Sequence, residues 1–280
     1  MSENKFIVTL PPHFRDGEKT YRIMGCVLLP LICAIALSTY YYGARVIVIS
    51  LISVASCVLS EWLFQRLTLR KMTIGDLSAV VTGLLLACTL PPSIPVWMPV
   101  VGGVFAIVVV KQLFGGLGKN FMNPALAARA FMTLSWPLSF ATWPKVHTIL
   151  PLFKTVDVIS SATPLSALRN GAMPDTNLLQ MFIGERGGSI GETAAVVLLA
   201  GGILLLVTRV ITWHIPVSFI GTVALGAWLF PRVSYGGGEY ILMELLSGGL
   251  LLGAIYMATD YSSSPVNPLG KIIFGIGCGA

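Results

Sequence analysis

The chain consists mainly of long apolar runs that alternate with short polar segments. Such runs predict helices that cross a membrane, because crossing about 30 Å of hydrocarbon takes about 20 mostly apolar residues. The sequence predicts nine spans, at residues 22–41, 45–64, 76–90, 96–114, 121–137, 191–211, 215–230, 240–259 and from about residue 269. We therefore expect an all-α integral membrane protein.

Two of the predicted spans run into proline-rich breaks. Span 76–90 leads into residues 90–92, which read Leu-Pro-Pro, and span 240–259 leads into Asp260 and then Pro265. Proline removes a backbone donor, so a break at membrane depth must be sheltered by protein or must line a cavity. We expect both breaks to lie near the functional centre.

The stretches 82–87 and 248–253, which precede these breaks, are similar in sequence and indicate an internal repeat. Two halves of five helices run antiparallel because five is odd, as in the inverted repeats of transporters. Only about ten apolar residues follow Lys271, so we expect the tenth helix to lie beyond Ala280. The predicted regions are a cytoplasmic segment 1–20, a first repeat 21–137, a loop 138–190 and a second repeat 191–280, which lacks its last helix.

Composition excludes a water-soluble protein. Hydrophobic residues make up 55% of the chain and charged residues 11%, against about 25% charged in soluble domains. The net charge of +6 needs no nucleic-acid partner, because basic loops beside a membrane give the same excess. The five cysteines lie inside apolar runs without CxxC spacing, so we expect no disulfide partner, zinc site or iron–sulfur cluster.

The positions of lysine and arginine predict the orientation. With the N-terminus inside, the short outer loops hold only Arg45 and Arg232, and this bias places the N-terminus in the cytoplasm. The 138–190 loop is then extracytoplasmic. The inner segments hold Lys5, Arg15, Lys19, Arg22, Arg66, Arg70, Lys71, Lys111, Lys119, Arg209 and Lys271.

The outer loop contains a polar tract with two serines before a Thr-Pro pair. Pro164 biases Thr163 toward an extended backbone, which exposes its hydroxyl at the end of the tract. Ser160 and Ser161 could donate to a nearby phosphate. The alternative is an ordinary serine/threonine turn. The spacing of histidines and acids does not predict a hydrolase triad, so nucleophilic catalysis by Thr163 is not expected.

A glycine-rich segment, residues 115–118, joins the fourth and fifth predicted spans on the inner side. Glycine permits close backbone approach, and the following helix start offers free amide donors. Asn120 and Asn123 are spaced to share one face of that helix or to cap it. A binding site and a capped tight turn are both open readings of this segment.

Charged residues in or at the ends of spans form the third signal, because ionised groups there are costly and usually face protein or water. Asp76 and Asp260 occupy the two spans of the predicted repeat, and we expect them on an ion pathway. A helix cap for Asp76 and a simple helix end for Asp260 are the alternatives. The full set is Glu61, Asp76, Arg129, Glu244 and Asp260.

Four stretches together resemble the NqrB/RnfD family of membrane flavoproteins. The resemblance runs from about Tyr21 to Gly279, and the short N-terminal lead is most similar to the RnfD branch, a component of the Rnf ion-translocating electron transport complex. The stretches are KQLFGGLGKNFMNPALAARAF (111–131), SSATPL (160–165), TWHIPVSF (212–219) and ATDY (258–261).

The resemblance implies covalent FMN. The family's flavinylation motif reads roughly D-x-x-S/T-G-A-T, and its last threonine carries FMN through a phosphoester. Asp157, Ser160, Ala162 and Thr163 match this motif, which implies FMN on Thr163. Ser161 stands where the common residue is glycine, and this departure bears on the efficiency of attachment. A flavin transferase is the implied maturation partner.

The resemblance also implies non-covalent riboflavin near Asn120 and Asn123, and a fold like that of urea and ammonium channels, with ten helices in two inverted halves. The implied function is electron transfer in an inner-membrane ferredoxin:NAD⁺ oxidoreductase complex that moves Na⁺ or H⁺. The chain has no NAD fingerprint and no cysteine-ligated cluster, so we expect it to need the other subunits for activity. A channel or secondary transporter of the same architecture without redox function is the alternative, and a structural scaffold is a third reading.

Overall fold

The computed structural model describes residues 20–152, 163–232 and 237–280, and all regular secondary structure within them is helical. This confirms the all-α prediction. The elements are α1 (Thr20–Tyr42), α2 (Arg45–Leu67), η1 (Ile74–Asp76), α3 (Ser78–Thr89), α4 (Met98–Val104), η2 (Phe105–Gln112), α5 (Pro124–Ser135), α6 (Pro137–Ala141), α7 (Pro164–Arg169), α8 (Leu178–Ile183), η3 (Glu192–Ala194), α9 (Ala195–Val207), α10 (His214–Leu229), α11 (Gly237–Leu246), α12 (Leu250–Leu252), η4 (Gly253–Met257) and α13 (Pro268–Gly279).

Every predicted span contains a helix, but most of these helices are shorter than expected. By length and composition, α1 and α2 in the described chain can each cross a membrane, and α11 with α12–η4 passes as a pair bent by 63°. Helix α3 has 12 residues, and at 1.5 Å per residue such a helix is only about 18 Å long. The prediction of nine full crossings is therefore not met by the described residues taken one helix at a time.

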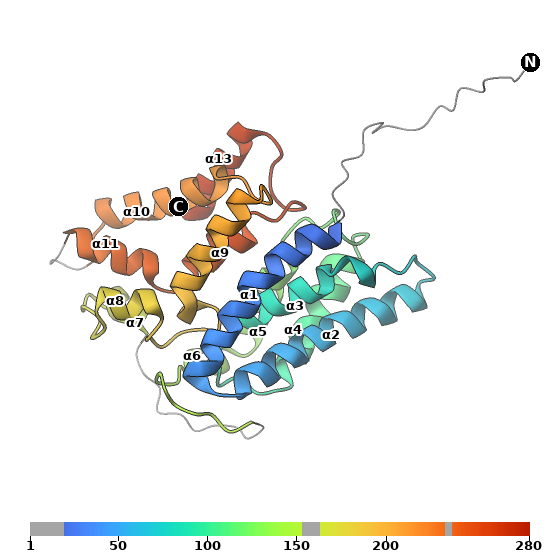
Figure 1. Ribbon diagram of the computed structural model, residues 1–280, viewed down its shortest axis with the longest axis horizontal. Coiled ribbons are helices and arrows are strands. Elements are labelled where there is room, and N and C mark those ends of the chain that lie inside the picture. Colours follow the sequence, from blue (N-terminus) through green and yellow to red (C-terminus); the bar gives the residue numbers. More distant parts are fainter. Residues whose placement is uncertain (1–19, 153–162, 233–236) are drawn as a thin grey trace, which may run out of the picture.

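Helices α1 and α9 lie side by side in the middle of the molecule (Figure 1). Helices α2, α3 and α4 pack together on one side of this pair, and α10, α11 and α13 lie on the other. One large apolar core joins both sides, with buried members such as Leu31 of α1, Leu86 of α3 and Leu198 of α9. The two sides therefore share a core.

The break after α3 is sheltered by a buried arginine. Leu90, at the end of α3, has extended backbone and is fully buried. The Arg45 guanidinium donates from Nε to the Pro92 carbonyl at 3.0 Å and from Nη2 to the Ile94 carbonyl at 2.9 Å. It also donates from Nη1 to the Pro151 carbonyl at 2.5 Å. These bonds satisfy backbone groups that the prolines leave without helical partners, as predicted for a break inside a membrane protein.

The second break lies earlier than the sequence predicts. Span 240–259 is not one helix, because α11 ends at Leu246 and the chain bends before α12 begins at Leu250. Gly248 supplies the bend with a positive φ of 61°. The match between stretches 82–87 and 248–253 consequently pairs the interior of α3 with a bend, so it does not extend to local conformation.

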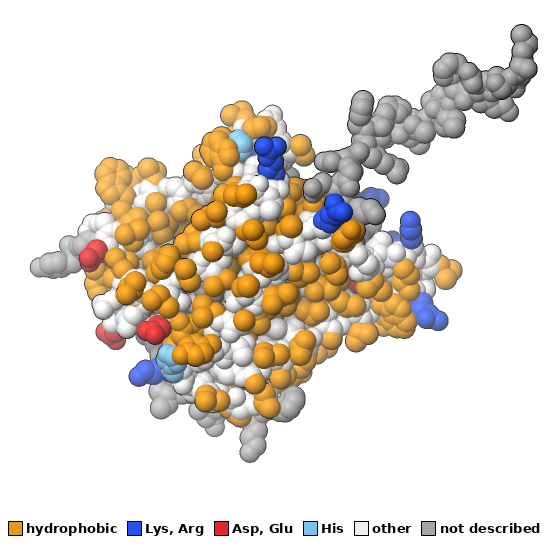
Figure 2. Space-filling view, viewed as in Figure 1, with side chains coloured by type: hydrophobic (Ala, Val, Ile, Leu, Met, Phe, Trp, Pro, Cys, Tyr) orange, Lys and Arg blue, Asp and Glu red, His pale blue; other side chains and the backbone are white. Residues whose placement is uncertain are grey.

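Hydrophobic side chains cover most of the face shown in Figure 2, and charged side chains lie along its edges. A wide exposed apolar surface of this kind fits lipid contact. Two basic residues that the orientation argument placed in loops are instead buried, namely Lys111 and Arg45. The predicted orientation therefore depends on the other basic positions.

Candidate functional site

A cavity lies between the two sides of the molecule, and it contains both predicted asparagines. Its empty volume is about 720 Å³, counting the part that opens to the outside, which falls within the range of about 300–1,000 Å³ typical of small-molecule sites. Most of its wall is apolar. Its polar lining residues include Ser78, Lys111, Asn120, Asn123, Tyr256 and Asp260.

Asn123 is the N-cap of α5. Its Oδ1 accepts from the backbone N–H of Ala125 at 3.0 Å and of Leu126 at 3.3 Å. Pro124 follows at the first helical position, where its missing N–H costs nothing. The Asn123 Nδ2 donates to the Met257 carbonyl of η4 at 3.2 Å. The capping alternative is therefore correct for this residue, which also ties α5 to η4.

Asn120 differs from Asn123 because its amide oxygen is not used. The side chain is 5% exposed, and Oδ1 has no hydrogen-bond partner among the residues that the structure describes. A buried acceptor without a partner costs about 1–3 kcal/mol. A ligand N–H in the cavity would satisfy it, and the ring of a flavin carries an N–H of this kind beside an apolar aromatic body. The residues present therefore fit a flavin.

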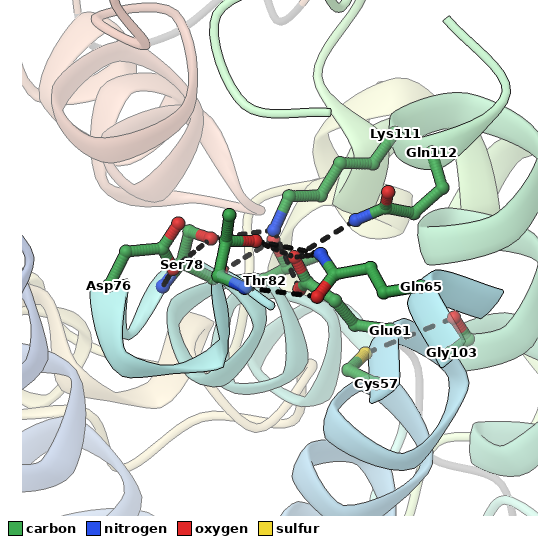
Figure 3. Close-up of polar contacts among 10 residues, drawn as sticks. Cys57, Glu61, Gln65, Asp76, Ser78, Thr82, Gly103, Lys111 and Gln112 are labelled. Atoms are coloured by element: carbon green, nitrogen blue, oxygen red, sulfur yellow. Dashed lines mark hydrogen bonds and ion pairs between the residues drawn. The ribbon is translucent and has the colours of Figure 1, made fainter. Parts of the chain in front are cut away.

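A buried ion pair lies next to this cavity (Figure 3). Lys111 of η2 donates from Nζ to Oε2 of Glu61 in α2 at 2.8 Å, and the two side chains are 1% and 0% exposed. Glu61 Oε1 also accepts from Gln65 Nε2 at 3.1 Å, from Gln112 Nε2 at 2.9 Å and from the Thr73 hydroxyl at 3.1 Å. The carboxylate is thus fully hydrogen-bonded, as a buried charge requires.

The same network reaches Asp76. Lys111 Nζ also donates to the Ser78 hydroxyl at 2.6 Å, and this hydroxyl donates to Asp76 Oδ1 at 2.6 Å. The Ser78 backbone N–H donates to the same oxygen at 2.8 Å, so Asp76 caps the start of α3. A chain of hydrogen bonds therefore runs from the half-buried Asp76 to the buried Glu61, and Figure 3 shows it.

Asp260 lies on the cavity wall, outside the Asp76 network. Its Oδ2 accepts from the hydroxyl groups of Ser262 at 2.9 Å and Ser263 at 3.3 Å. Ser78 and Lys111 line the same cavity. The structure thus brings Asp260 and the inner end of the Asp76 network to one space, whereas Asp76 itself lines a separate, outward-facing hollow.

On the other side of the molecule, Thr163 begins α7. Its backbone is extended, with φ −73° and ψ 151°, as the following proline predicts. Its hydroxyl oxygen accepts from the Ser166 backbone N–H at 3.2 Å. Thr163 lines two adjoining cavities, and Arg186 lines both of them as well. Asp157, Ser160 and Ser161 lie outside the described residues.

Sequence reasoning missed two parts of these sites. Lys111 was assigned to an inner segment and Glu61 to the end of a span, yet they meet across 50 positions. Glutamines one and four positions from these charges, Gln112 and Gln65, were an available signal for a buried polar cluster. Arg186 stands in the long loop, where nothing in the sequence singles it out.

A family model described as the NQR2, RnfD, RnfE family matches residues 7–280. The chain belongs to this family. The RnfD-like resemblance is thereby confirmed, and the helical structure with its long apolar helices is that of a multi-pass membrane protein.

Three relatives within the family bear related names, and each is the D component of a redox complex. The one from the Na(+)-translocating ferredoxin:NAD(+) oxidoreductase complex of Acetobacterium woodii is 43% identical over 284 residues, covering 100% of this chain and 84% of that protein. Its proton-translocating counterpart from Clostridium ljungdahlii is 36% identical over 296 residues, covering 100% and 86%. The one from the ion-translocating oxidoreductase complex of Stutzerimonas stutzeri is 39% identical over 295 residues, covering 92% and 80%.

Proposed function

We propose that this chain is an electron-carrying flavoprotein subunit of an ion-translocating ferredoxin:NAD⁺ oxidoreductase complex. The observation that carries the proposal is identity of 36–43% along the whole chain to the D components of such complexes. This likeness favours the redox function over a solute channel or a scaffold. The relatives named for Na⁺ and for protons are similar to this chain at comparable levels, so the coupling ion is a question for experiment.

The proposed flavins are FMN on Thr163 and riboflavin in the inner cavity. When bound, they supply electron transfer, while the protein positions them. The Thr163 hydroxyl is the group to be esterified, and the start of α7 holds it in place. At the inner cavity, the Asn120 oxygen accepts from the ring, and the apolar wall excludes water. A flavin transferase supplies the covalent group.

The proposed architecture has two inverted five-helix halves, with the N-terminus in the cytoplasm and residues 138–190 outside. The short helices, the break after α3 and the 63° bend before α12 support it, since broken helices at the centre are typical of such folds. The blue side chains that lie near the residue 20 end of Figure 2 support the orientation.

The proposed function can be tested in membrane vesicles that contain the complete complex. Reduced ferredoxin and NAD⁺ should drive ion uptake into inverted vesicles, and vesicles from cells lacking this chain should neither transport ions nor reduce NAD⁺. Denaturing-gel fluorescence of the same preparation reads the covalent flavin separately. Full ferredoxin-driven uptake without this chain would contradict the proposed function.

Asn120→Leu is expected to lower the amount of extractable riboflavin while leaving covalent FMN unchanged. The replaced oxygen makes no other hydrogen bond among the described residues, so the fold loses little. Removing one neutral hydrogen bond weakens binding by about two- to tenfold. Extraction followed by chromatography measures the riboflavin.

Asn170→Leu is the matched control, because Asn170 is exposed and distant in sequence from the cavity residues. Asn123→Leu should cost about 1 kcal/mol of stability through the lost cap, with riboflavin loss as a secondary effect. Unchanged riboflavin in Asn120→Leu would place the ring elsewhere.

Asp76→Asn and Asp260→Asn are each expected to slow ion-coupled turnover and to change its dependence on Na⁺ or pH. Carboxylate oxygens suit a hard cation and can also take a proton. Asparagine caps helices as well as aspartate does, so the start of α3 should persist and both flavins should stay bound. Turnover of each purified complex across a Na⁺ series measures the effect.

Asp175→Asn serves as the control for a lost carboxylate at an exposed site. If the two variants show wild-type activation curves, their carboxylates have no part in the ion route, and Asp76 is only a helix cap.

A further inference from the structure

The cavity beside Thr163 is lined by two arginines. It has a volume of about 170 Å³, and its wall includes Arg129 of α5 and Arg186 from the loop before η3. An adjoining cavity of about 510 Å³ is also lined by Thr163 and Arg186. The hydroxyl group and the Arg186 side chain therefore face the same space from different segments.

Arg186 is buried and only partly hydrogen-bonded. The residue is 3% exposed, and its Nη2 donates to the Glu192 carbonyl at 2.6 Å. Its Nε and Nη1 have no partner among the described residues. Tyr42 holds the Arg186 backbone by donating its hydroxyl to the Arg186 carbonyl at 3.2 Å. Buried donors without acceptors are rare and costly, which points to a missing anionic acceptor.

The charges around the cavity favour an anion. The Arg129 Nη1 donates to the Thr89 carbonyl at 2.6 Å, which fixes the second guanidinium on the wall. Glu192 opposes an anion, and its carboxylate accepts from the Ser189 backbone N–H at 3.2 Å. Two guanidinium groups against one carboxylate leave the site net positive. Burial lowers the pKa of Arg186, and Glu192 raises it.

We propose that Arg186 binds the phosphate group of a flavin nucleotide at Thr163, with Arg129 adding positive charge. The proposal rests on the proposed attachment of FMN at this threonine. A phosphoester puts the phosphorus one bond from the Thr163 oxygen, so the phosphate oxygens lie at the wall that Arg186 lines. Guanidinium N–H groups donate strongly to phosphate oxygens. The two unpartnered nitrogens of Arg186 provide the donors.

The test uses the complete complex carrying Thr163→Ala, which cannot hold covalent flavin, so that binding is read without attachment. FMN labelled with ³²P is added with excess unlabelled riboflavin, which fills any site that needs no phosphate. Retained label is expected, and inorganic phosphate should compete for it. Adding Arg186→Gln should reduce the FMN affinity by about tenfold to a hundredfold, the effect of losing charge-assisted hydrogen bonds.

Arg169→Gln is the matched control, because Arg169 is exposed, belongs to α7 and lines neither cavity. It should leave retention unchanged. If Arg186→Gln does not assemble, Arg186→Lys replaces it, and a several-fold weaker FMN affinity is expected because lysine lacks the Nε and Nη1 donors.

Equal FMN retention with and without the Arg186 change, or complete displacement by riboflavin, would overturn the phosphate site. Absence of covalent flavin from the wild-type protein is a separate result that contradicts attachment. Because the Thr163→Ala experiment does not depend on attachment, the two failures can be told apart.

Discussion

Glu61→Gln is expected to destabilise the protein by about 3–5 kcal/mol, which should lower its melting temperature by about 10 °C or more. Glutamine has nearly the same shape, so no cavity forms. The change removes the negative charge opposite Lys111, and the Ser78 hydroxyl then remains as the neighbour of a buried ammonium group. The measurement is thermal unfolding of the purified complex in detergent, together with the assembled yield.

Glu239→Gln provides the control for the same chemical change at an exposed site. The double variant Glu61→Gln/Lys111→Met should recover part of the lost stability, because no unpaired charge remains. Methionine fills the space of the lysine stem. A Glu61→Gln complex that melts with the wild type would show that the ion pair contributes nothing to stability.

Thr163→Ala is expected to abolish the flavin fluorescence of the denatured protein band, since alanine has no oxygen to esterify. The effect should be complete. The substitution also removes the acceptor for the Ser166 backbone N–H, which costs about 0.5–2 kcal/mol of stability. In-gel fluorescence normalised to protein amount measures the attachment.

Thr163→Asn separates these two effects. Asparagine is a good N-cap but carries no hydroxyl, so the fold should keep its wild-type stability while the fluorescence is lost. Thr142→Ala, at an exposed position in the same loop, should keep full fluorescence. A fluorescent band from Thr163→Asn would move the attachment point to another residue.

The positions of the helices could be predicted from sequence because apolar runs and proline signals are local. Their lengths could not be predicted as well. Gly248 and Gly249 continue an apolar run, yet the positive φ of Gly248 bends the chain. Hydropathy registers only that glycine is apolar and small, whereas the bend depends on packing between distant segments.

The site was predictable where one local rule decides it. Pro164 predicts the extended Thr163, and the observed backbone agrees. The division of roles between Asn120 and Asn123 was not predictable, because both asparagines satisfy the same spacing rule. Only the fold shows that Asn123 caps α5 while the oxygen of Asn120 is left for a ligand.

The buried ion pair was missed for a different reason. A charged residue in a hydropathy profile reads as the end of a span, and Lys111 was interpreted in this way. Its partner Glu61 lies 50 positions earlier. Pairing at such a distance is a property of how α2 and η2 pack, and a single sequence carries no direct record of it.

The bonds of Arg45 also bear on the order in which the protein is made. Synthesis proceeds from the N-terminus, and segments fold as they emerge. The acceptors of Arg45 described above, from Pro92 to Pro151, all belong to the first half of the chain. This half can therefore neutralise the cost of its buried guanidinium before the second half exists. The Leu90 carbonyl remains open until Ile190 donates to it at 3.0 Å, so the nascent first half offers the second a prepared docking point.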